Sequence, residues 1–321
     1  MKKYAIAKDF KILCGYKPPI NKFIAWLGRT FWWLVPKGKK DKAVESKKIV
    51  LKSTKDGAKF FALLFQSASK TRGKGAKLKS GKKSQNDTVD VNKKTSCLIY
   101  FHGGAFVFGP IWAHYRNAQR CVKETGCKVF FVRYRLAPRY PYPKGTEDCE
   151  QACRYLLDHA DEFGVDKDRI AVGGDSAGGF MATWVARYMA QSLNILPKML
   201  MLLYPVISPD ENYPSMQEFE DAPVWNTRAN KKMWKLFAQG KDVDCHWDCG
   251  RFAKIPAVYV ETAQFDCLRD PAKDFAEKIR QKGGCVVLNQ TVGTPHGYDV
   301  IGKSKVTEDN IKKRMQALRE V

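Results

Sequence analysis

The stretch RIAVGGDSAGG, residues 169–179, decides how the rest of the chain is interpreted. Its apolar first half predicts a buried strand, and the residues from 177 to 191 that follow have the pattern of a helix. Between the two lies GDSAG (174–178), a G-x-S-x-G motif on a strand-to-helix turn. Such a turn raises a serine hydroxyl above the sheet, and small flanking residues let the chain reverse without clashes. The motif also occurs by chance in ordinary glycine-rich turns, so Ser176 needs partners before it can be interpreted as a nucleophile.

Short apolar runs alternate with helix-like stretches on both sides of this motif. Strands are expected at 58–65, 97–101, 128–134, 169–174, 198–204, 257–262 and 284–289. Helices are expected near 111–126, 146–163, 177–191, 270–282 and 307–319. Strands that are apolar throughout and alternate with helices are typical of a parallel sheet covered on both faces. We therefore predict an α/β fold with a mostly parallel central sheet and helices on both faces.

Three segments fall outside this rhythm. Residues 208–253 are rich in Trp, Pro and charge, and they look like an insertion over one end of the sheet. Residues 20–36 are apolar and aromatic but too short to span a bilayer, so they predict a helix packed on the protein body or, alternatively, an interfacial helix. Residues 67–95 are rich in Lys, Gly and Ser and predict a long exposed loop. The expected division is a cap made of 1–50 and 208–253, and a core made of 51–207 and 254–321.

The composition limits the class of protein. A chain of 321 residues with 44% hydrophobic side chains fits one large α/β domain or two small ones, and it excludes a wholly disordered chain. The 56 Lys and Arg residues against 33 Asp and Glu residues give a net charge of +23, which favours polyanions or anionic lipid surfaces as neighbours. No aromatic side chains are interleaved with the lysines of 67–95, so no specific nucleic-acid partner is expected.

The cysteines and the N-terminus bear on the compartment. Ten cysteines are spread thinly along the chain, which is typical of reduced thiols and not of a secreted disulfide framework. Lys8 and Asp9 interrupt the apolar region that a signal peptide needs, so cytoplasmic residence is the default expectation. The segment CHWDC (245–249) carries three soft ligands but has no second Cys/His pair at zinc-finger spacing. We therefore expect no metal there.

A second candidate element, HGG (102–104), comes directly after the predicted strand 97–101. A glycine pair at a strand end lets the backbone approach a ligand closely. Its N–H groups could stabilise the negative charge of a tetrahedral intermediate. His102 itself is expected to be a structural hydrogen-bonding residue and not a base.

A base and an orienting acid can be sought after the later strands. His296 lies in TPHGY (294–298) after the last predicted strand, and Asp266 follows the strand 257–262. Asp270 is an alternative acid, but its position favours a role as the cap of the next helix. Because catalytic groups gather where parallel strands end, we expect these side chains to lie near Ser176.

Together these motifs resemble the hormone-sensitive-lipase-like (family IV) esterases of the α/β-hydrolase superfamily. The matching stretches lie within about residues 95–320 and are HGGAF (102–106), YRLAPRYPYP (134–143), GDSAGG (174–179), DCLRD (266–270) and HGY (296–298). The resemblance implies that Ser176 is the nucleophile, His296 the general base and Asp266 its partner. It also implies an oxyanion hole made of the N–H groups of Gly103, Gly104 and Ala177. The family uses no cofactor and hydrolyses carboxylic esters, commonly with short acyl chains.

This sequence departs from the family pattern at Ala105, where a glycine is usual, at Arg139, where an acidic residue is frequent, and at Cys267, where proline is usual. None of these changes removes a catalytic group. We expect a serine carboxylesterase that acts on short- to medium-chain small-molecule esters. The alternatives are a lipid-ester hydrolase in peripheral contact with an anionic membrane, and a non-enzymatic binding protein on the same scaffold. The sequence leaves the oligomeric state open.

Overall fold

The computed structural model describes residues 4–21, 23, 41–68, 94–245 and 255–321. The predictions for 20–36, for the loop 67–95 and for the segment 245–249 concern residues that lie largely outside these ranges. They therefore stay predictions.

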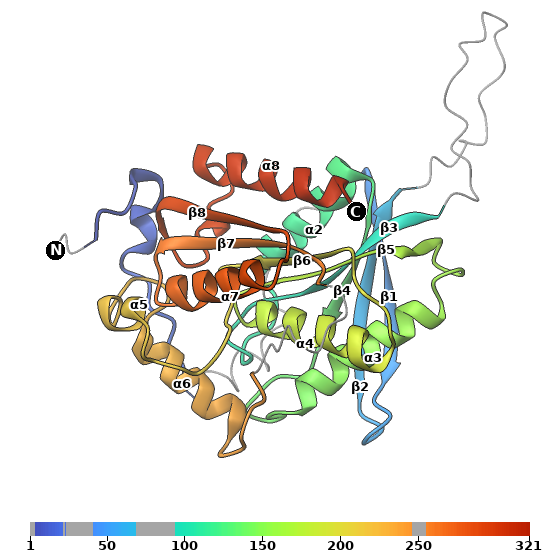
Figure 1. Ribbon diagram of the computed structural model, residues 1–321, viewed down its shortest axis with the longest axis horizontal. Helices are drawn as coiled ribbons and strands as arrows, with labels where there is room; N and C mark the ends of the chain where they lie inside the picture. Colours follow the sequence, from blue (N-terminus) through green and yellow to red (C-terminus); the bar gives the residue numbers. More distant parts are fainter. Residues whose placement is uncertain (1–3, 22, 24–40, 69–93, 246–254) are drawn as a thin grey trace, which may run out of the picture.

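Within the described residues, eight strands form one sheet in the order β1-β2-β4-β3-β5-β6-β7-β8 (Figure 1). Strand β2 runs antiparallel to both of its neighbours, and the pairs from β4 to β8 are parallel. The predicted mostly parallel sheet is confirmed. The strands are β1 Val44–Lys52, β2 Lys59–Ser67, β3 Thr95–Phe101, β4 Lys128–Arg133, β5 Val165–Asp175, β6 Met199–Leu203, β7 Ala257–Phe265 and β8 Val286–Pro295.

Helices cover both faces of this sheet (Figure 1). Helices α2 (Trp112–Thr125) and α8 (Lys305–Arg319) lie on one face. Helices α3 (Lys144–Asp158), α4 (Ala177–Ser192) and α7 (Arg269–Gln281) lie on the other. The central strands are sandwiched between these layers, and every residue of β6 is buried. This burial explains the continuous apolar runs in the central strands, such as CLIYF (97–101) in β3 and the whole of β6.

The sheet brings the expected site residues to one edge. Strands β3, β5, β7 and β8 are parallel, so their carboxyl ends meet there. The chain passes from β3 to β4 on one side and reaches β5 on the other, so the strand order reverses between them. Ligand sites of open α/β sheets lie at such a switch point.

Strand β1 corrects the predicted boundary of the N-terminal segment. The sequence predicts residues 44–50 to be part of the cap, but they belong to β1, which pairs with β2 along its whole length. Only Ile49 and Leu51 are buried in this edge strand, whose other residues are mostly charged and exposed. The strand is held by its backbone ladder, and an apolar pattern was therefore missing from the sequence.

The N-terminal residues lie against the 208–253 insertion, whose described part contains the helices α5 (Pro214–Glu218) and α6 (Thr227–Ala238). The Val224 N–H donates to the Tyr16 carbonyl at 2.8 Å. The Tyr4 hydroxyl donates to Asp221 Oδ1 at 2.6 Å. A short 3₁₀ helix, η1 (Lys8–Leu13), lies between these two contacts along the chain, and a second one, η4 (Tyr298–Val300), follows β8.

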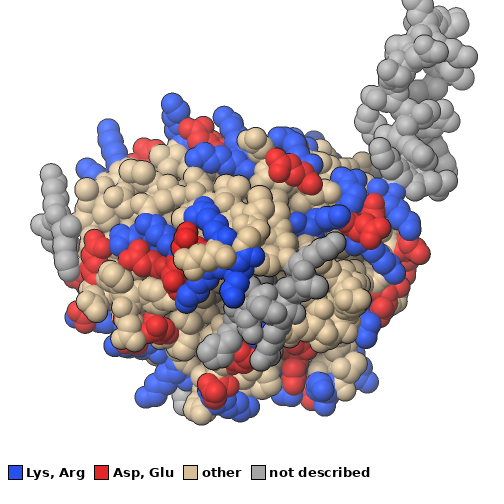
Figure 2. Space-filling view, viewed as in Figure 1, with Lys and Arg blue, Asp and Glu red and all other residues tan. Residues whose placement is uncertain are grey.

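The surface charge is mixed on the face that Figure 2 shows, where acidic side chains are interspersed among the lysines and arginines. Among the described residues, several basic groups of the molecule are paired, for example Arg120 with Glu308 at 2.8 Å and Lys94 with Asp161 at 2.6 Å. On this face the basic excess is not gathered into one patch. In the part of the chain that the structure describes, no helix has both the length and the apolar composition needed to cross a membrane.

Candidate active site

Ser176 occupies a strained turn between β5 and α4. Its backbone has φ 52° and ψ −121°, a conformation that costs a non-glycine residue free energy. The turn is tight on both sides, because a Cβ at Gly174 would overlap the Gly178 carbonyl and a Cβ at Gly178 would overlap the Phe101 carbonyl. The two glycines of the motif are therefore required by close backbone approach.

His296 and Asp266 meet Ser176 although the three residues are far apart in sequence. His296 Nε2 lies 2.9 Å from Ser176 Oγ, and His296 Nδ1 lies 2.6 Å from Asp266 Oδ2. A carboxylate can only accept, so Nδ1 donates to Asp266 and Nε2 is left to accept the serine hydroxyl. The imidazole is thus held in the tautomer that can take a proton from Ser176.

The environment of Asp266 and Asp270 separates the two candidate acids. Asp266 is fully buried and also accepts the Leu268 N–H at 3.0 Å. Asp270 lies inside the first turn of α7, where it pairs with Arg269 at 2.7 Å and accepts the Ser215 N–H at 2.9 Å. The expectation that Asp270 caps the next helix along the chain is wrong. It caps the N-terminus of α5, which lies beside α7.

The backbone after β3 differs from the predicted oxyanion hole. The Gly103 N–H donates to Asp175 Oδ1 at 3.0 Å, so it is already engaged. This hydrogen bond contradicts the prediction that Gly103 is a donor of the oxyanion hole. In the described part of the chain, the N–H groups of Gly104 and Ala105 have no acceptor, and both residues line the cavity beside Ser176. Ala177 begins α4, where helix N–H groups lack partners within the helix.

His102 is a structural residue, as the sequence suggested. Its ring stacks on Tyr134 with a centroid distance of 4.6 Å, and its Nδ1 lies 2.6 Å from the Gly103 carbonyl. Burial lowers the pKa of His102 to about 3, so the imidazole is neutral. It lies beside the strand β4 and makes no hydrogen bond to Ser176.

His114 was not identified from the sequence, where nothing distinguishes it from a surface histidine of an amphipathic helix. It lies on α2 and its Nε2 is 3.1 Å from Asp175 Oδ2. Burial alone would raise the pKa of Asp175, but His114, Tyr100 and the Gly103 N–H lower it to about 2. The residue that precedes Ser176 is therefore an ionised, buried carboxylate.

A cavity of about 580 Å³ opens above Ser176 and His296. Its volume is in the range of small-molecule sites. Its outer walls are apolar and come from the N-terminal segment, the loop after β3 and the insertion, with Leu13, Tyr16, Pro18, Pro19, Phe108, Ile111, Val224 and Trp225 among them. The Trp225 ring lies over His296 with a centroid distance of 5.9 Å. Among the residues that the structure describes, no three His, Cys, Asp or Glu side chains are grouped to hold a metal ion.

A family model described as alpha/beta hydrolase fold matches residues 98–300, which is more than half of the chain. The chain belongs to this family. The match confirms the resemblance to hormone-sensitive-lipase-like enzymes that the motifs predicted. Among curated proteins, the chain is similar to esterase LipI of Mycobacterium tuberculosis, with 34% identity over 210 residues that cover 63% of this chain and 65% of that protein. It is also similar to carboxylesterase NlhH of the same species, with 32% identity that covers 63% of this chain and 66% of that protein.

The matched part of this chain thus spans just under two thirds of the length of these curated relatives. Solved structures extend the likeness of the fold to nearly the whole chain. The crystal structure of esterase LipW from Mycobacterium marinum superposes with a TM-score of 0.82 at 19% identity, covering 99% of this chain and 96% of that one. At that identity the similarity shows the fold alone.

Proposed function

We propose that this protein is a serine carboxylesterase in which Ser176 is the nucleophile, His296 the general base and Asp266 the acid that orients it. The observation that carries the proposal is the 2.9 Å contact between His296 Nε2 and Ser176 Oγ, with Asp266 on the other ring nitrogen. Relatives named esterase and carboxylesterase support the same reaction class.

The chemistry is acyl transfer in two steps. His296 Nε2 takes the hydroxyl proton as Ser176 Oγ attacks the ester carbonyl, and Asp266 stabilises the imidazolium that forms. His296 then gives this proton to the leaving alcohol, and an acyl-enzyme remains on Ser176. A water molecule repeats the sequence on the acyl-enzyme and releases the carboxylic acid.

The oxyanion of each tetrahedral intermediate needs donors that point into the cavity and are not otherwise engaged. Gly104 and Ala105 line the cavity, and Ala177 begins α4 next to Ser176. Among the described residues the N–H groups of these three have no acceptor, whereas the Gly103 N–H is held by Asp175. We therefore assign the oxyanion hole to the N–H groups of Gly104, Ala105 and Ala177. Gly103 acts instead as the anchor that fixes the start of this loop.

The cavity favours apolar esters of limited size. About 580 Å³ is shared between the acyl and the alcohol group, and the outer walls offer apolar contacts in place of charges. A relative of 28% identity is named ethyl acetate hydrolase, which fits a small substrate. We propose short- to medium-chain carboxylic esters as substrates, bound under a cap formed by the N-terminal segment and the 208–253 insertion.

Hydrolysis of p-nitrophenyl esters from acetyl to palmitoyl tests this proposal. We expect the highest kcat/KM at short to medium acyl lengths, and loss of activity after treatment with diethyl p-nitrophenyl phosphate. In Ser176→Ala, kcat should fall by about 10⁴–10⁶-fold, as in other enzymes that lose this nucleophile. Turnover in that variant close to the wild-type rate would refute the assignment. Highest activity on palmitoyl ester presented in anionic vesicles would instead favour the lipid-ester alternative.

A further inference from the structure

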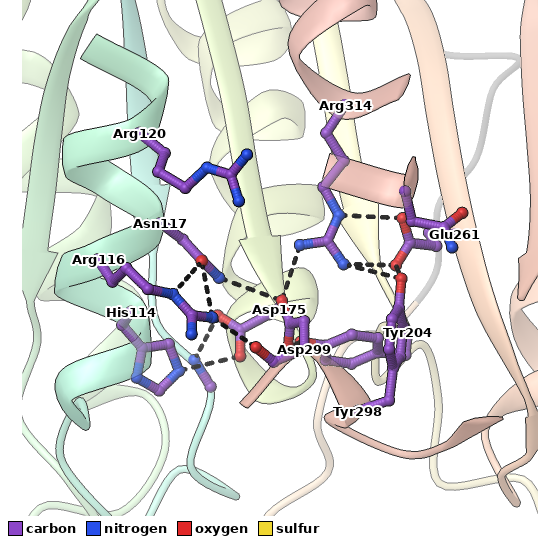
Figure 3. Close-up of polar contacts among 12 residues, drawn as sticks. His114, Arg116, Asn117, Arg120, Asp175, Tyr204, Glu261, Tyr298, Asp299 and Arg314 are labelled. Carbon is purple, nitrogen blue, oxygen red and sulfur yellow. Dashed lines mark hydrogen bonds and ion pairs between the residues drawn. The ribbon is translucent and has the colours of Figure 1, made fainter. Parts of the chain in front are cut away.

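Two buried carboxylates flank the proposed catalytic residues. Asp175 directly precedes Ser176, and Asp299 follows His296 by three positions in the chain. Both carboxylates face helix α2, as Figure 3 shows. The loop that carries the nucleophile and the loop that carries the base therefore contact the same helix.

Asp175 joins the Ser176 turn to the oxyanion loop. Its Oδ1 accepts the Gly103 N–H at 3.0 Å and the Tyr100 hydroxyl at 2.6 Å. Its Oδ2 lies 3.1 Å from His114 Nε2. A displacement of this carboxylate would move the nucleophile and the oxyanion donors together.

Asp299 holds the loop of His296 in the same way. Its Oδ1 accepts the Tyr204 hydroxyl at 2.7 Å, and its Oδ2 accepts Asn117 Nδ2 at 3.1 Å and Arg314 Nη1 at 2.7 Å. Arg314 belongs to α8 on the same side of the sheet (Figure 3). The carboxylate is thus clamped between α2 and α8.

His114 and Asn117 are three residues apart on α2, so they lie on one face of the helix. We propose that these two side chains are positioning residues, which fix the Ser176 turn and the His296 loop relative to each other through Asp175 and Asp299. The inference rests on the proposed function, because it assigns the alignment of the reacting groups to α2. Neither residue is itself a catalytic acid or base.

The hydrogen bonds of His114 define what this side chain supplies. The Ile111 N–H donates to His114 Nδ1 at 2.8 Å, so Nδ1 is the accepting nitrogen of the neutral imidazole. The proton is then on Nε2, which donates to Asp175. Nδ1 therefore stabilises the first turn of α2, and Nε2 contacts the carboxylate next to the proposed nucleophile.

Because the two ring nitrogens of His114 have different hydrogen-bond partners, each contact can be removed by its own substitution. The amide of asparagine reaches about as far as Nδ1, so His114→Asn can keep the acceptor for Ile111 but loses the donor to Asp175. The longer glutamine places its amide near the Nε2 position, so His114→Gln keeps the donor to Asp175 and loses the acceptor for Ile111. A role through Asp175 and a role limited to the helix turn predict opposite rankings of the two variants.

We expect His114→Asn to lower kcat on p-nitrophenyl butyrate by about 100-fold with little change in KM, as expected for reacting groups displaced by about 1 Å. His114→Gln should stay within about threefold of the wild type, because its amide restores the contact with Asp175. The rate of phosphorylation of Ser176 by diethyl p-nitrophenyl phosphate should follow the same order. This readout reports the alignment of Ser176 and does not move with a loss of stability alone.

Asn117 provides an independent arm of the test. Asn117→Asp preserves the shape of the side chain but replaces the donor to Asp299 with a second carboxylate, and kcat should fall by about tenfold or more. The matched control is Arg120→Gln, on the same helix, where Arg120 pairs with Glu124 and Glu308 away from the cavity. This control should lower the midpoint of thermal unfolding without lowering kcat.

Three results would overturn the proposal. These are a wild-type kcat in His114→Asn, an equal or larger loss in His114→Gln, and a wild-type kcat in Asn117→Asp. If His114→Asn does not fold, the Asn117→Asp result decides. Absence of ester hydrolysis by the wild-type protein would instead refute the proposed function, so the two failures are distinguishable.

Discussion

The guanidinium of Arg314 forms a buried ion pair with the carboxylate of Glu261, with 2.5 Å between Nη2 and Oε1. Arg314 comes from α8 and Glu261 from β7, so the pair joins the C-terminal helix to the sheet. The Tyr298 hydroxyl donates to the same carboxylate at 2.8 Å. The buried charges behind the proposed active site are therefore compensated by one another.

Removal of Arg314 should destabilise the fold strongly. In Arg314→Met the carboxylates of Glu261 and Asp299 lose their buried cation, and breaking such a pair costs about 3–5 kcal/mol. Urea denaturation should show this loss in the free energy of unfolding. The double variant Arg314→Met/Glu261→Gln should recover part of it, because one uncompensated charge is then removed. A loss below about 1 kcal/mol, the range of surface pairs, would contradict this account.

The orienting acid gives a sharper test of the proposed mechanism than removal of the nucleophile. Asp266→Asn keeps the size of the side chain but offers His296 Nδ1 an amide in place of a carboxylate. The imidazole can then adopt the tautomer whose Nε2 carries a proton and cannot accept one from Ser176, and kcat should fall by about 10⁴-fold. Asp270→Asn is the control, because Asp270 serves α5 and should alter stability more than kcat. Equal losses of kcat in both variants would refute the assignment of Asp266 as the acid that orients His296.

How far the site could be predicted from the sequence depends on the kind of signal that each residue leaves. Ser176, Asp266 and His296 each follow a strand that the sequence predicts, and parallel strands bring such positions to one edge of the sheet. The free oxyanion donors could not be chosen in this way, because Gly103, Gly104 and Ala105 offer three consecutive N–H groups. Which of them is occupied depends on the side chain of Asp175, 72 residues from Gly103.

The fold shows the same limit. The sequence predicts the central strands because both of their faces are buried, which makes β6 apolar throughout and β3 apolar from Cys97 onward. Strand β1 was missed because only its two residues Ile49 and Leu51 are buried and the ladder with β2 supplies the rest of its stability. His114 was missed because its significance lies in a contact with a residue 61 positions away.

The lowered pKa of Asp175 predicts that the free energy of unfolding depends on pH in the acidic range. Burial opposes ionisation, but His114, Tyr100 and Gly103 lower the pKa of Asp175 from 3.8 to about 2. As the pH falls, the unfolded chain binds this proton before the folded protein does. The stabilisation is therefore fully present above about pH 4 and is lost as the pH falls to about 2.

Urea denaturation at several pH values between 2 and 6 can measure this contribution. The free energy of unfolding should fall less steeply below pH 4 in Asp175→Asn than in the wild type, because the variant has no carboxylate at this position to protonate. Asp309→Asn, which changes an exposed carboxylate on α8, serves as the control and should leave the steep fall in place. Parallel pH profiles for Asp175→Asn and the wild type would contradict the prediction.

The last prediction concerns the wall that the insertion contributes to the cavity. Trp225 is buried, lies over His296 and lines the cavity beside Val224, whose N–H is bonded to the Tyr16 carbonyl. Trp225→Ala should enlarge the cavity where the ester binds. We expect the ratio of kcat/KM for octanoyl over acetyl esters to rise by about tenfold, since apolar contacts of this size change selectivity by 10-fold or more.

Trp184→Ala is the control for this prediction. It removes an indole that is bonded to Glu150 away from the cavity, and it should lower stability without changing this ratio. An unchanged ratio in Trp225→Ala would show that the insertion does not limit acyl length, and the outer wall would then have to be sought at Tyr16 and Leu13.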